Sequence, residues 1–338
     1  MRETNPLPAP PPGKTGWPWI RGSGVLPETG GDLRVTIVTP SFNQVDYLEE
    51  TIRSVLLQGY QDLDYIVVDG GSTDGSVDLI RRYEPWITWW VSEPDGGQAD
   101  AINKGFSEAT GSILGWLNSD DIFYPDFIAR RVAEFVAAPE VDLFYGDVEV
   151  GSSSGGPEVI IRGSATDFET MVRTLDVPIP QQSTLWRAEV LEKVGDLDAR
   201  WQVVLDREFF TRVARHCRLE YRPWVTGLFR TQPDSKSVVQ QLKWVEELPE
   251  MYSEFFSDPS LPAEIKILER ESLVAMEHMC AQLLWRNDRR RQWVGCVGRA
   301  VMRSPRQFAR QFIVGGARSK VRGALRRLGN IVERPTTS

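Results

Sequence analysis

The chain has 338 residues, of which 41% are hydrophobic and 25% charged, and its formal net charge is -8. These values are typical of a soluble globular protein with one large or two smaller domains, and no apolar run approaches the roughly 20 residues of a membrane helix. Three widely separated cysteines and two histidines lack the spacing of a disulfide framework or a zinc site, so we expect a reducing, cytoplasmic setting.

The chain begins with a segment rich in proline and glycine. Residues 1–33 contain PLPAPPPG, GWPWIRGSG and PETGG, a composition that resists regular structure and is unlike a signal peptide. We expect an extended N-terminal arm, with Trp17 and Trp19 as candidate contacts to the body of the protein.

Strands and helices then alternate regularly. β-branched runs predict strands at 34–40, 64–70, 87–93, 112–117 and 141–150, and apolar residues at helical spacing predict helices at 46–57, 75–84, 98–109 and 125–137. This alternation predicts an α/β fold with a mostly parallel sheet covered by helices on both faces. Sheets of this kind bind ligands at the carboxyl ends of their strands.

A glycine- and serine-rich loop at 151–157 separates this half from a second one that ends near residue 238. The second half mixes short strands at 159–163, 183–187 and 219–224 with helices, one of them at 206–216. Residues 239–338 read as a helical C-terminal extension. We therefore expect an α/β domain at 34–238, with halves at 34–150 and 151–238.

Each of the first four strands ends in small polar or acidic residues. These ends read TPSFN, DGGSTDG, SEPDGGQ and NSDD. Like charges at one edge of a sheet repel each other unless a cation or a ligand offsets them. DGGSTDG could instead be a turn followed by a helix cap, and it matches neither a phosphate loop nor a dinucleotide fingerprint. NSDD could also be a helix cap, but IFYP separates it from the next helix.

Four motifs, taken in order and spacing, carry a resemblance to a known family. TPSFNQ, VDGGSTDGS, EPDGGQADAINKG and WLNSDD resemble glycosyltransferase family 2, and the resemblance covers about residues 35–237. It implies a glycosyltransferase A fold, a catalytic domain at 34–238 and an inverting enzyme that uses a nucleotide-sugar donor, with UDP as the expected nucleotide.

The resemblance implies donor contacts at every strand end and on the helix after the third strand. These implied nucleotide and donor contacts are Thr39, Pro40, Phe42, Asp69, Asp95, Gln98, Asp100, Asn103, Lys104, Asn118 and Asp120. The first three would cradle the base, and Asp69 would hold the uracil or the ribose.

NSDD occupies the position of the family's metal-binding motif. The resemblance makes Asp120 and Asp121 ligands of Mn²⁺ or Mg²⁺, hard cations that prefer carboxylates. The sequence departs from the family at Asn118, where an aspartate is common, so Asp120 and Asp121 must supply the negative charge. Which of the two contacts the metal stays open.

Two later segments resemble the remaining parts of the family's site. In VLDREFFTRVA, Asp206 matches the position of the catalytic base, although it could simply cap a helix. In FRTQPDSKS, Arg230 and Lys236 match the loop over the donor diphosphate, although both could be plain surface charges. The histidines, His216 and His278, are expected to be bystanders.

The end of the chain is strongly basic. From Arg286 onward there are 14 Lys or Arg and 2 Asp or Glu, a balance of +12, which leaves -20 for the preceding residues. A basic amphipathic helix can lie on an anionic membrane, but this region could equally pack on the acidic body. We do not expect nucleic acid as a partner, because the acidic body would repel it.

We therefore expect a metal-dependent transferase that moves a sugar to a hydroxyl of a saccharide or lipid-linked acceptor, in cell-surface polysaccharide or glycolipid synthesis. Any peripheral contact would be at the inner face of the cell membrane. One alternative is a non-catalytic, nucleotide-sugar-binding subunit of a synthase, which the neutral Asn118 would suit. Another is a sugar-nucleotide pyrophosphorylase, which should carry a glycine-rich, lysine-bearing loop that TPSFNQ lacks.

Overall fold

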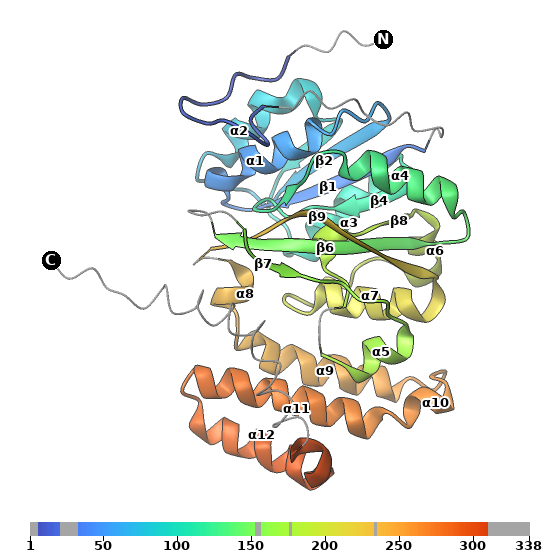
Figure 1. Cartoon of the computed structure of the whole chain (residues 1–338). Coiled ribbons are helices and arrows are strands. Elements are labelled where there is room, and N and C mark those ends of the chain that lie inside the picture. Colours follow the sequence, from blue (N-terminus) through green and yellow to red (C-terminus); the bar gives the residue numbers. More distant parts are fainter. Residues whose placement is uncertain (1–5, 21–32, 153–156, 176–177, 233–234, 310–338) are drawn as a thin grey trace, which may run out of the picture.

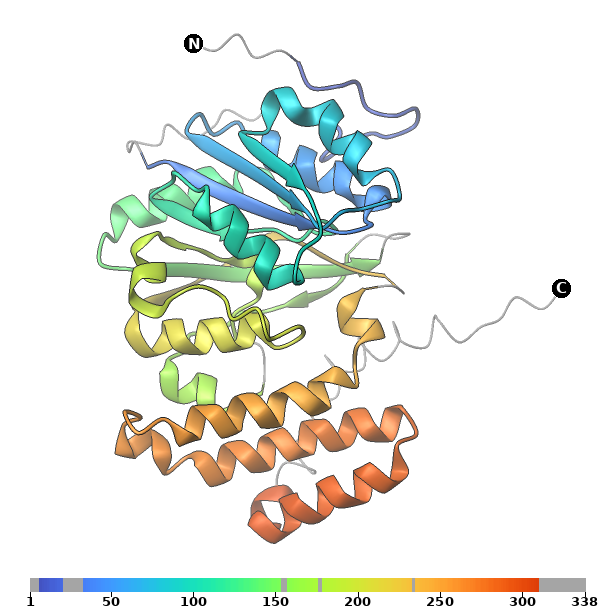
Figure 2. The same cartoon turned by 180° about the vertical axis from the view of Figure 1, so that it is seen from behind.

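The protein is described from a computed structural model that covers residues 6–20, 33–152, 157–175, 178–232 and 235–309. Within these ranges, nine strands form one sheet in the order β3-β2-β1-β4-β8-β6-β9-β5, with β7 added beside β6. Helices cover both faces of the sheet, and further helices stack at one end of the molecule (Figures 1 and 2).

The first half of the fold contains the predicted parallel strands. Its elements are β1 (Val35–Ser41), α1 (Val45–Leu56), β2 (Leu63–Asp69), α2 (Ser76–Tyr83), a 3₁₀ turn (Glu84–Trp86), β3 (Trp89–Ser92), α3 (Gln98–Ser107) and β4 (Ile113–Trp116). β1 pairs in parallel with β2 and β4, and β2 pairs in parallel with β3. The carboxyl ends of all four strands therefore lie along one edge, as the sequence predicts.

The second half is mixed in direction. It comprises β5 (Ile122–Phe123), α4 (Phe127–Ala137), β6 (Leu143–Ser152), β7 (Pro157–Ile161), α5 (Phe168–Arg173), a 3₁₀ turn (Gln181–Ser183), β8 (Leu185–Arg187), α6 (Glu189–Val194), α7 (Leu205–His216) and β9 (Leu219–Thr231). The short β8 lies between β4 and β6 and is antiparallel to both, whereas β9 is parallel to β6. Hydrophobic pattern does not encode strand direction, so this insertion could not be predicted.

The core lies on both faces of the sheet. Along β1, Val35 and Ile37 face α1, α2 and α4, whereas Val38 faces α3 and α7. This two-sided burial explains why the predicted strands are continuous apolar runs. Stacked and edge-on aromatic rings fill the α7 side, where Trp116 contacts Phe210 at 5.9 Å between ring centroids.

The C-terminal helices pack on the body of the protein. They are α8 (Lys236–Val239), α9 (Lys243–Ser257), α10 (Ala263–Lys266), α11 (Glu269–Arg286) and α12 (Arg290–Arg303). Buried side chains of α9 and α11 belong to the same hydrophobic cluster as those of α3 and α7. Of the basic region that begins at Arg286, α12 packs against α11, whereas residues 310–338 lie outside the described residues. The domain boundaries remain a proposal. Within the described residues, no helix has the length and apolar character needed to cross a bilayer.

The described part of the N-terminal arm, residues 6–20, is hydrogen-bonded to α1. Arg53 is only 3% exposed, and its guanidinium donates to the carbonyl oxygens of Pro8 at 2.8 Å and Trp19 at 2.8 Å and to the Tyr83 hydroxyl at 2.9 Å. Trp17 Nε1 donates to a body carbonyl at 2.8 Å. Both predicted tryptophan contacts are thus present.

Arg53→Ala should lower the free energy of unfolding by about 3 kcal/mol, because it leaves several buried acceptors without a donor. Arg81→Ala is the matched control, since Arg81 is exposed and pairs with Asp78 in its own helix, and it should change stability by less than about 0.5 kcal/mol. Urea unfolding of both variants measures the difference. Equal losses would contradict the structural role of Arg53.

Candidate active site

The loops after the first three strands are tied together by hydrogen bonds. The Asp69 carboxylate at the end of β2 accepts from the backbone of Ser72 at 2.8 Å and from the hydroxyl of Ser92 at 2.7 Å. Asn43, just after β1, donates through its backbone to the Ser72 hydroxyl at 2.7 Å. Asp69 is fully buried. It therefore shapes the loops around the site, as the turn alternative for DGGSTDG suggested.

The segment before α3 crosses these loops at close range. A side chain at Gly70 would come within 2.7 Å of the Asp95 carboxylate, which would then have to move. Gly97 has a φ of +118°, and its backbone N–H donates to Asp95 at 2.9 Å. Asp100 accepts from the backbone of Gly96 at 2.9 Å. Asp95 and Asp100 thus fix the turn that leads into α3.

A chain of amides links α3, the end of β4 and α8. Gln98 Nε2 donates to the side-chain oxygen of Asn118 at 2.7 Å, and Lys236 Nζ donates to the Gln98 side-chain oxygen at 3.2 Å. Burial lowers the pKa of Lys236, and nearby Lys243 lowers it further. Residues from three separate parts of the sequence, all expected at the site, therefore meet here.

The acid pair at the end of β4 has two different environments. Asp121 is fully buried and accepts from the Arg230 backbone at 2.9 Å, Gln182 Nε2 at 3.0 Å and Asn118 Nδ2 at 3.2 Å. Asp120 is only partly buried and accepts from Gln232 Nε2 at 2.9 Å. Asp121 is thus satisfied by protein donors, whereas Asp120 keeps oxygen lone pairs free.

Burial raises the pKa of both carboxyls, and the charge of Asp120 raises that of Asp121 further. A buried acid pair in this position favours protons or a cation. The helix-cap alternative for NSDD is wrong, because β5 intervenes and Asp126 occupies the cap of α4.

The available carboxylates fit a metal ion whose other ligands are phosphates and waters. Among the residues that the structure describes, no three His, Cys, Asp or Glu side chains cluster closely enough to hold a metal ion. Magnesium and manganese ions are often held by one or two carboxylates, with phosphates and waters completing the shell. Asp120, with its free lone pairs, fits that kind of site, and Asp121 fits a supporting position.

Arg230 is not a surface charge. Its side chain is 5% exposed, pairs with Glu50 on α1 and lies 5.0 Å from the centroid of the Tyr47 ring. Glu50 in turn pairs with Lys14 of the N-terminal arm at 3.1 Å. Arg230 Nη1 is buried without a hydrogen-bond partner. The surface alternative is therefore wrong for Arg230, and its charge lowers the pKa of Asp120 against the larger effect of burial.

Asp206 lies in the first turn of α7. The helix cap is Val204, so the cap alternative for Asp206 is wrong. Side chains three and four residues apart share one side of a helix, which places Asp206 on the side of Phe209 and Phe210. Both rings contact Trp116 near the end of β4. Burial raises the pKa of Asp206, while the Arg207 backbone N–H and charge lower it.

Some of the side chains that the family resemblance implies as donor contacts are buried or bind other parts of the protein. Thr39 and Pro40 are buried within β1, and the Thr39 hydroxyl accepts from Tyr65 at 3.1 Å, so only Phe42, at 60% exposure, offers an open side chain there. Asn103 holds the backbone of Leu197 through two hydrogen bonds, at 2.7 and 3.1 Å.

Lys104 pairs with Glu93 at 2.6 Å, and this partner raises the pKa of Lys104. These contacts shape the surroundings of α3. The structure therefore does not bring the side chains of Thr39, Pro40, Asn103 and Lys104 into the network around Asn118.

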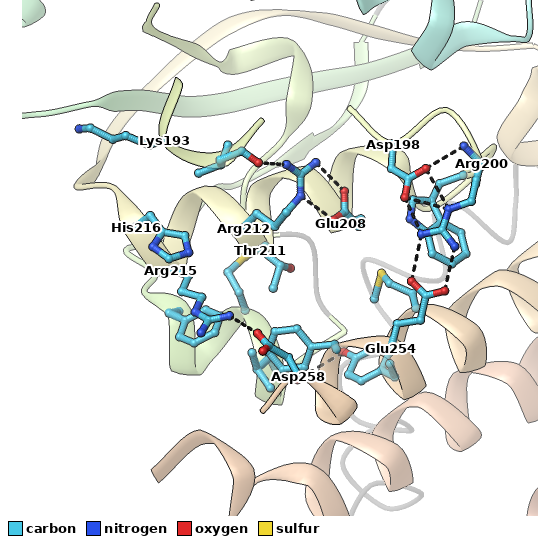
Figure 3. A pocket seen from close by; sticks show the side chains of 18 residues that line it. Lys193, Asp198, Arg200, Glu208, Thr211, Arg212, Arg215, His216, Glu254 and Asp258 are labelled. Carbon is cyan, nitrogen blue, oxygen red and sulfur yellow. Dashed lines mark hydrogen bonds and ion pairs between the residues drawn. The ribbon is translucent and has the colours of Figure 1, made fainter. Parts of the chain in front are cut away.

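A cavity of about 320 Å³ lies away from this edge, between α5, α6, α7 and α9 (Figure 3). Its acidic and basic side chains form ion pairs, as in Arg212 with Glu208 at 2.6 Å and Arg215 with Asp258 at 2.7 Å. Because these charges are satisfied by their ion-pair partners, we do not place the chemistry here.

Comparisons with known proteins agree with this geometry. Residues 36–188 match the model of the family described as Glycosyl transferase family 2. The chain is 33% identical over 188 residues to an uncharacterized glycosyltransferase of Mycobacterium tuberculosis, covering 54% of this chain and 70% of that protein. The chain belongs to glycosyltransferase family 2. It is thus a glycosyltransferase, and the predicted family is confirmed.

Another relative of this family 2 enzyme is a PGL/p-HBAD biosynthesis glycosyltransferase of Mycobacterium bovis, which is 30% identical over 181 residues, covering 52% of this chain and 68% of that protein. Among solved structures, TarS 1-349 of S. aureus in complex with UDP-GlcNAc has a TM-score of 0.62 at 14% identity, covering 82% of this chain and 83% of that one.

Mannosyltransferase PcManGT of Pyrobaculum calidifontis, in complex with GDP-Man and Mn²⁺, has a TM-score of 0.56 at 18% identity, covering 90% and 86%. At these identities the two solved structures support the fold alone. The predicted glycosyltransferase A fold with a helical C-terminal region is confirmed.

Several polar residues around the site of this family 2 enzyme were not singled out from the sequence. They are Glu50, Gln181, Gln182, Gln232 and Glu247. Each of them is a polar side chain that the fold buries or half-buries beside an acid or a backbone donor. No spacing rule predicts such contacts, because each links segments far apart in the chain.

Glu247 of α9 holds the loop that leads to Asp206. Its carboxylate, 6% exposed, accepts from the backbone N–H groups of Gln202 at 3.0 Å, Val203 at 2.9 Å and Val204 at 3.3 Å. The C-terminal region thus positions the start of α7 from outside the segment that matches the family model.

Glu247→Ala should destabilise the protein by about 2–3 kcal/mol, since it leaves buried N–H groups unpaired. It should also lower turnover more than it raises the donor KM, because α7 carries Asp206. Glu247→Gln keeps an acceptor oxygen and should restore much of both losses. Thermal melts and steady-state kinetics measure the two effects, and an alanine variant with unchanged kcat would contradict the positioning role.

Proposed function

We propose that this glycosyltransferase moves a sugar from a UDP-sugar to an acceptor hydroxyl by a single, inverting displacement. The observation that carries the proposal is the unequal acid pair at the end of β4, with Asp120 open and Asp121 held by protein donors. Trp116, at the end of the same strand, contacts Phe209 and Phe210 of α7, whose first turn carries another partly buried acid, Asp206.

The donor would lie across the strand-end loops. Phe42 offers an exposed ring for the base, and Asp69, Asp95 and Asp100 shape the loops beneath the nucleotide. Gln98 and Lys236 reach the same place from α3 and α8, where the ammonium would face the diphosphate. Arg230 has a buried, unpartnered Nη1 close to the acid pair, which suits a diphosphate oxygen.

A divalent cation bound at Asp120 would act as a Lewis acid that offsets the charge of the leaving diphosphate. Asp121 would keep Asp120 and the Arg230 backbone in place through its own hydrogen bonds. The amide of Asn118 would orient the pair without adding charge, since it donates to Asp121 at 3.2 Å.

Asp206 would accept the proton of the acceptor hydroxyl as that oxygen attacks the anomeric carbon. Burial raises the pKa of this carboxyl toward the range in which a general base works well near neutral pH. Attack from the face opposite the diphosphate inverts the anomeric configuration.

We further propose that the acceptor is a saccharide or lipid-linked glycan of the cell surface. The support is the name of a relative in PGL/p-HBAD biosynthesis. The family assignment argues against the pyrophosphorylase alternative. A non-catalytic subunit would have no need of Asp206 beside the donor, which is why we favour an active enzyme.

Calorimetric titration with UDP and with GDP, each with and without Mn²⁺, tests the donor proposal. We expect UDP to bind more tightly than GDP and Mn²⁺ to strengthen UDP binding about tenfold or more. Tighter binding of GDP, or UDP binding that ignores the metal, would contradict the proposed donor or its cation.

The acid pair predicts a pH dependence of stability in metal-free protein. Because burial raises both pKa values in the folded state, the folded protein binds protons more tightly than the unfolded chain. Stability should therefore fall as pH rises from about 4, the ordinary carboxyl range, to neutral. Asp120→Asn should flatten this fall, and thermal melts across pH in the presence of EDTA measure it. An equally steep fall in the variant would contradict the assignment.

A further inference from the structure

The helix α12 has one buried side and one open side. Cys296 and Ala300 are fully buried against α11, whereas Val294 is 62% and Met302 85% exposed on the opposite side. A side chain added at Gly298, between them, would meet nothing within 4 Å. Exposed apolar residues in a row are unusual on a protein surface that has no partner.

The same part of the molecule is strongly basic. Residues 286–309 hold seven arginines and one acid, Asp288. In the ion pairs of the described residues, Asp288 pairs with Arg290 and the body residue Glu277 pairs with Arg299, while Arg291 is exposed beside the apolar row. Figures 1 and 2 show α12 at the end of the molecule opposite to α2.

An aromatic pair borders this surface. Trp285, at 51% exposure, lies 5.0 Å from Trp293 between ring centroids, and the guanidinium of Arg290 stacks 3.6 Å above the Trp285 ring. Tryptophan beside arginine is favoured at the level of lipid head groups, where a ring is partly apolar and partly wet.

We propose that this face, formed by Trp285, Arg290, Arg291, Val294, Val301 and Met302, binds an anionic lipid surface. The apolar row would enter the head-group boundary while the arginines bind lipid phosphates. The acidic remainder of the chain would be repelled, which orients the enzyme with α12 toward the lipid.

A lipid surface fits better than two other occupants. A nucleic acid would place phosphates against Val294 and Met302, which gain nothing from them. A second copy in a two-fold dimer would bring arginine against arginine. Lipid binding itself does not depend on the proposed function. Its biological role does, because that role is to bring the enzyme to a lipid-linked acceptor.

Sedimentation of the full chain with vesicles tests this proposal without any donor, so the two proposals can fail separately. We expect binding to phosphatidylcholine vesicles that contain phosphatidylglycerol and none to phosphatidylcholine alone. Arg290→Gln with Arg291→Gln should weaken binding about twenty-five-fold, since each arginine contributes roughly fivefold. The matched control is Arg81→Gln with Arg82→Gln, a tandem exposed pair on α2, which should keep nearly wild-type binding.

A second pair of substitutions tests the apolar residues of this face. Val294→Gln with Met302→Gln should weaken vesicle binding about tenfold, whereas Val136→Gln should not. Val136 is 46% exposed but lies on α4, which packs on the sheet. Circular dichroism and UDP binding of each variant should match the wild type.

Four results would overturn the proposal. They are absence of binding to anionic vesicles, equal losses in the control variants, binding of a DNA duplex as tight as that of vesicles, and a dimer in light scattering that Val294→Gln with Met302→Gln dissociates.

Discussion

Asp206→Asn is expected to reduce sugar transfer by about 10²–10⁴-fold, the usual contribution of a positioned general base. The amide is nearly the same size and still accepts the Arg207 backbone N–H, a bond of 2.7 Å in the wild type. It cannot, however, take a proton from the acceptor. Donor affinity should stay within a few fold, because no diphosphate contact is assigned to Asp206.

Steady-state kinetics with a saturating donor measure the turnover, and titration of UDP measures the affinity. Glu208→Gln is a suitable control, since Glu208 lies in the same first turn but pairs with Arg212 on the cavity side of α7. Near-normal turnover in Asp206→Asn would exclude Asp206 as the base. Equal losses in both variants would indicate that the helix, rather than the carboxylate, was damaged.

Asp120→Ala is expected to weaken Mn²⁺-dependent UDP binding by on the order of a hundredfold while barely changing stability. Within the described part of the chain, Gln232 is the one side chain that donates to Asp120, so removing the carboxylate leaves little unpaired. Burial also disfavours the charged form of Asp120. The variant should bind UDP equally with and without the metal.

Asp121→Ala should instead lower the stability of the protein. It removes the acceptor of the Arg230 backbone, of Gln182 and of Asn118. Leaving such buried donors unpaired costs about 1–3 kcal/mol each, which offsets the gain from removing a buried charge. Melting temperature and calorimetry on both variants separate the roles. The opposite pattern, with Asp121→Ala stable and Asp120→Ala unstable, would exchange the two assignments.

The first four strands and their polar ends were predictable because each signal is local. VTIVTPS and LDYIVVD are short β-branched runs, and each is followed by turn residues that stop the strand. Parallel pairing then brings Ser41, Asp69 and Ser92 to one edge. The location of the candidate site follows from this regularity.

The parts that could not be predicted depend on contacts between distant segments. Asp120 and Asp121 are neighbours in sequence, yet they differ because Gln182, Arg230 and Gln232 approach from the second half. Thr39 and Asn103 match family motifs, but their side chains bind Tyr65 and Leu197 instead of facing the Asn118 network. Burial of each side chain, which the motif does not encode, decides such cases.

The insertion of β8 and the contribution of α9 have the same origin. Leu185–Arg187 is a strand of three residues whose direction is set by its two neighbours. In the sequence, Glu247 looks like an ordinary acidic residue of a helix. Its contacts arise because α9 packs against the loop before α7. The C-terminal helices therefore help to build the site, although the family model ends at residue 188.

Release of nucleotide from a panel of UDP-, GDP- and dTDP-sugars, measured with Mn²⁺ and a candidate lipid-linked acceptor, tests the central claim most directly. We predict that a UDP-sugar gives acceptor-dependent release, that EDTA abolishes it, and that Asp120→Ala and Asp206→Asn each reduce it by about 10²-fold or more. Release that persists in both variants, or no release from any sugar nucleotide, would contradict the account.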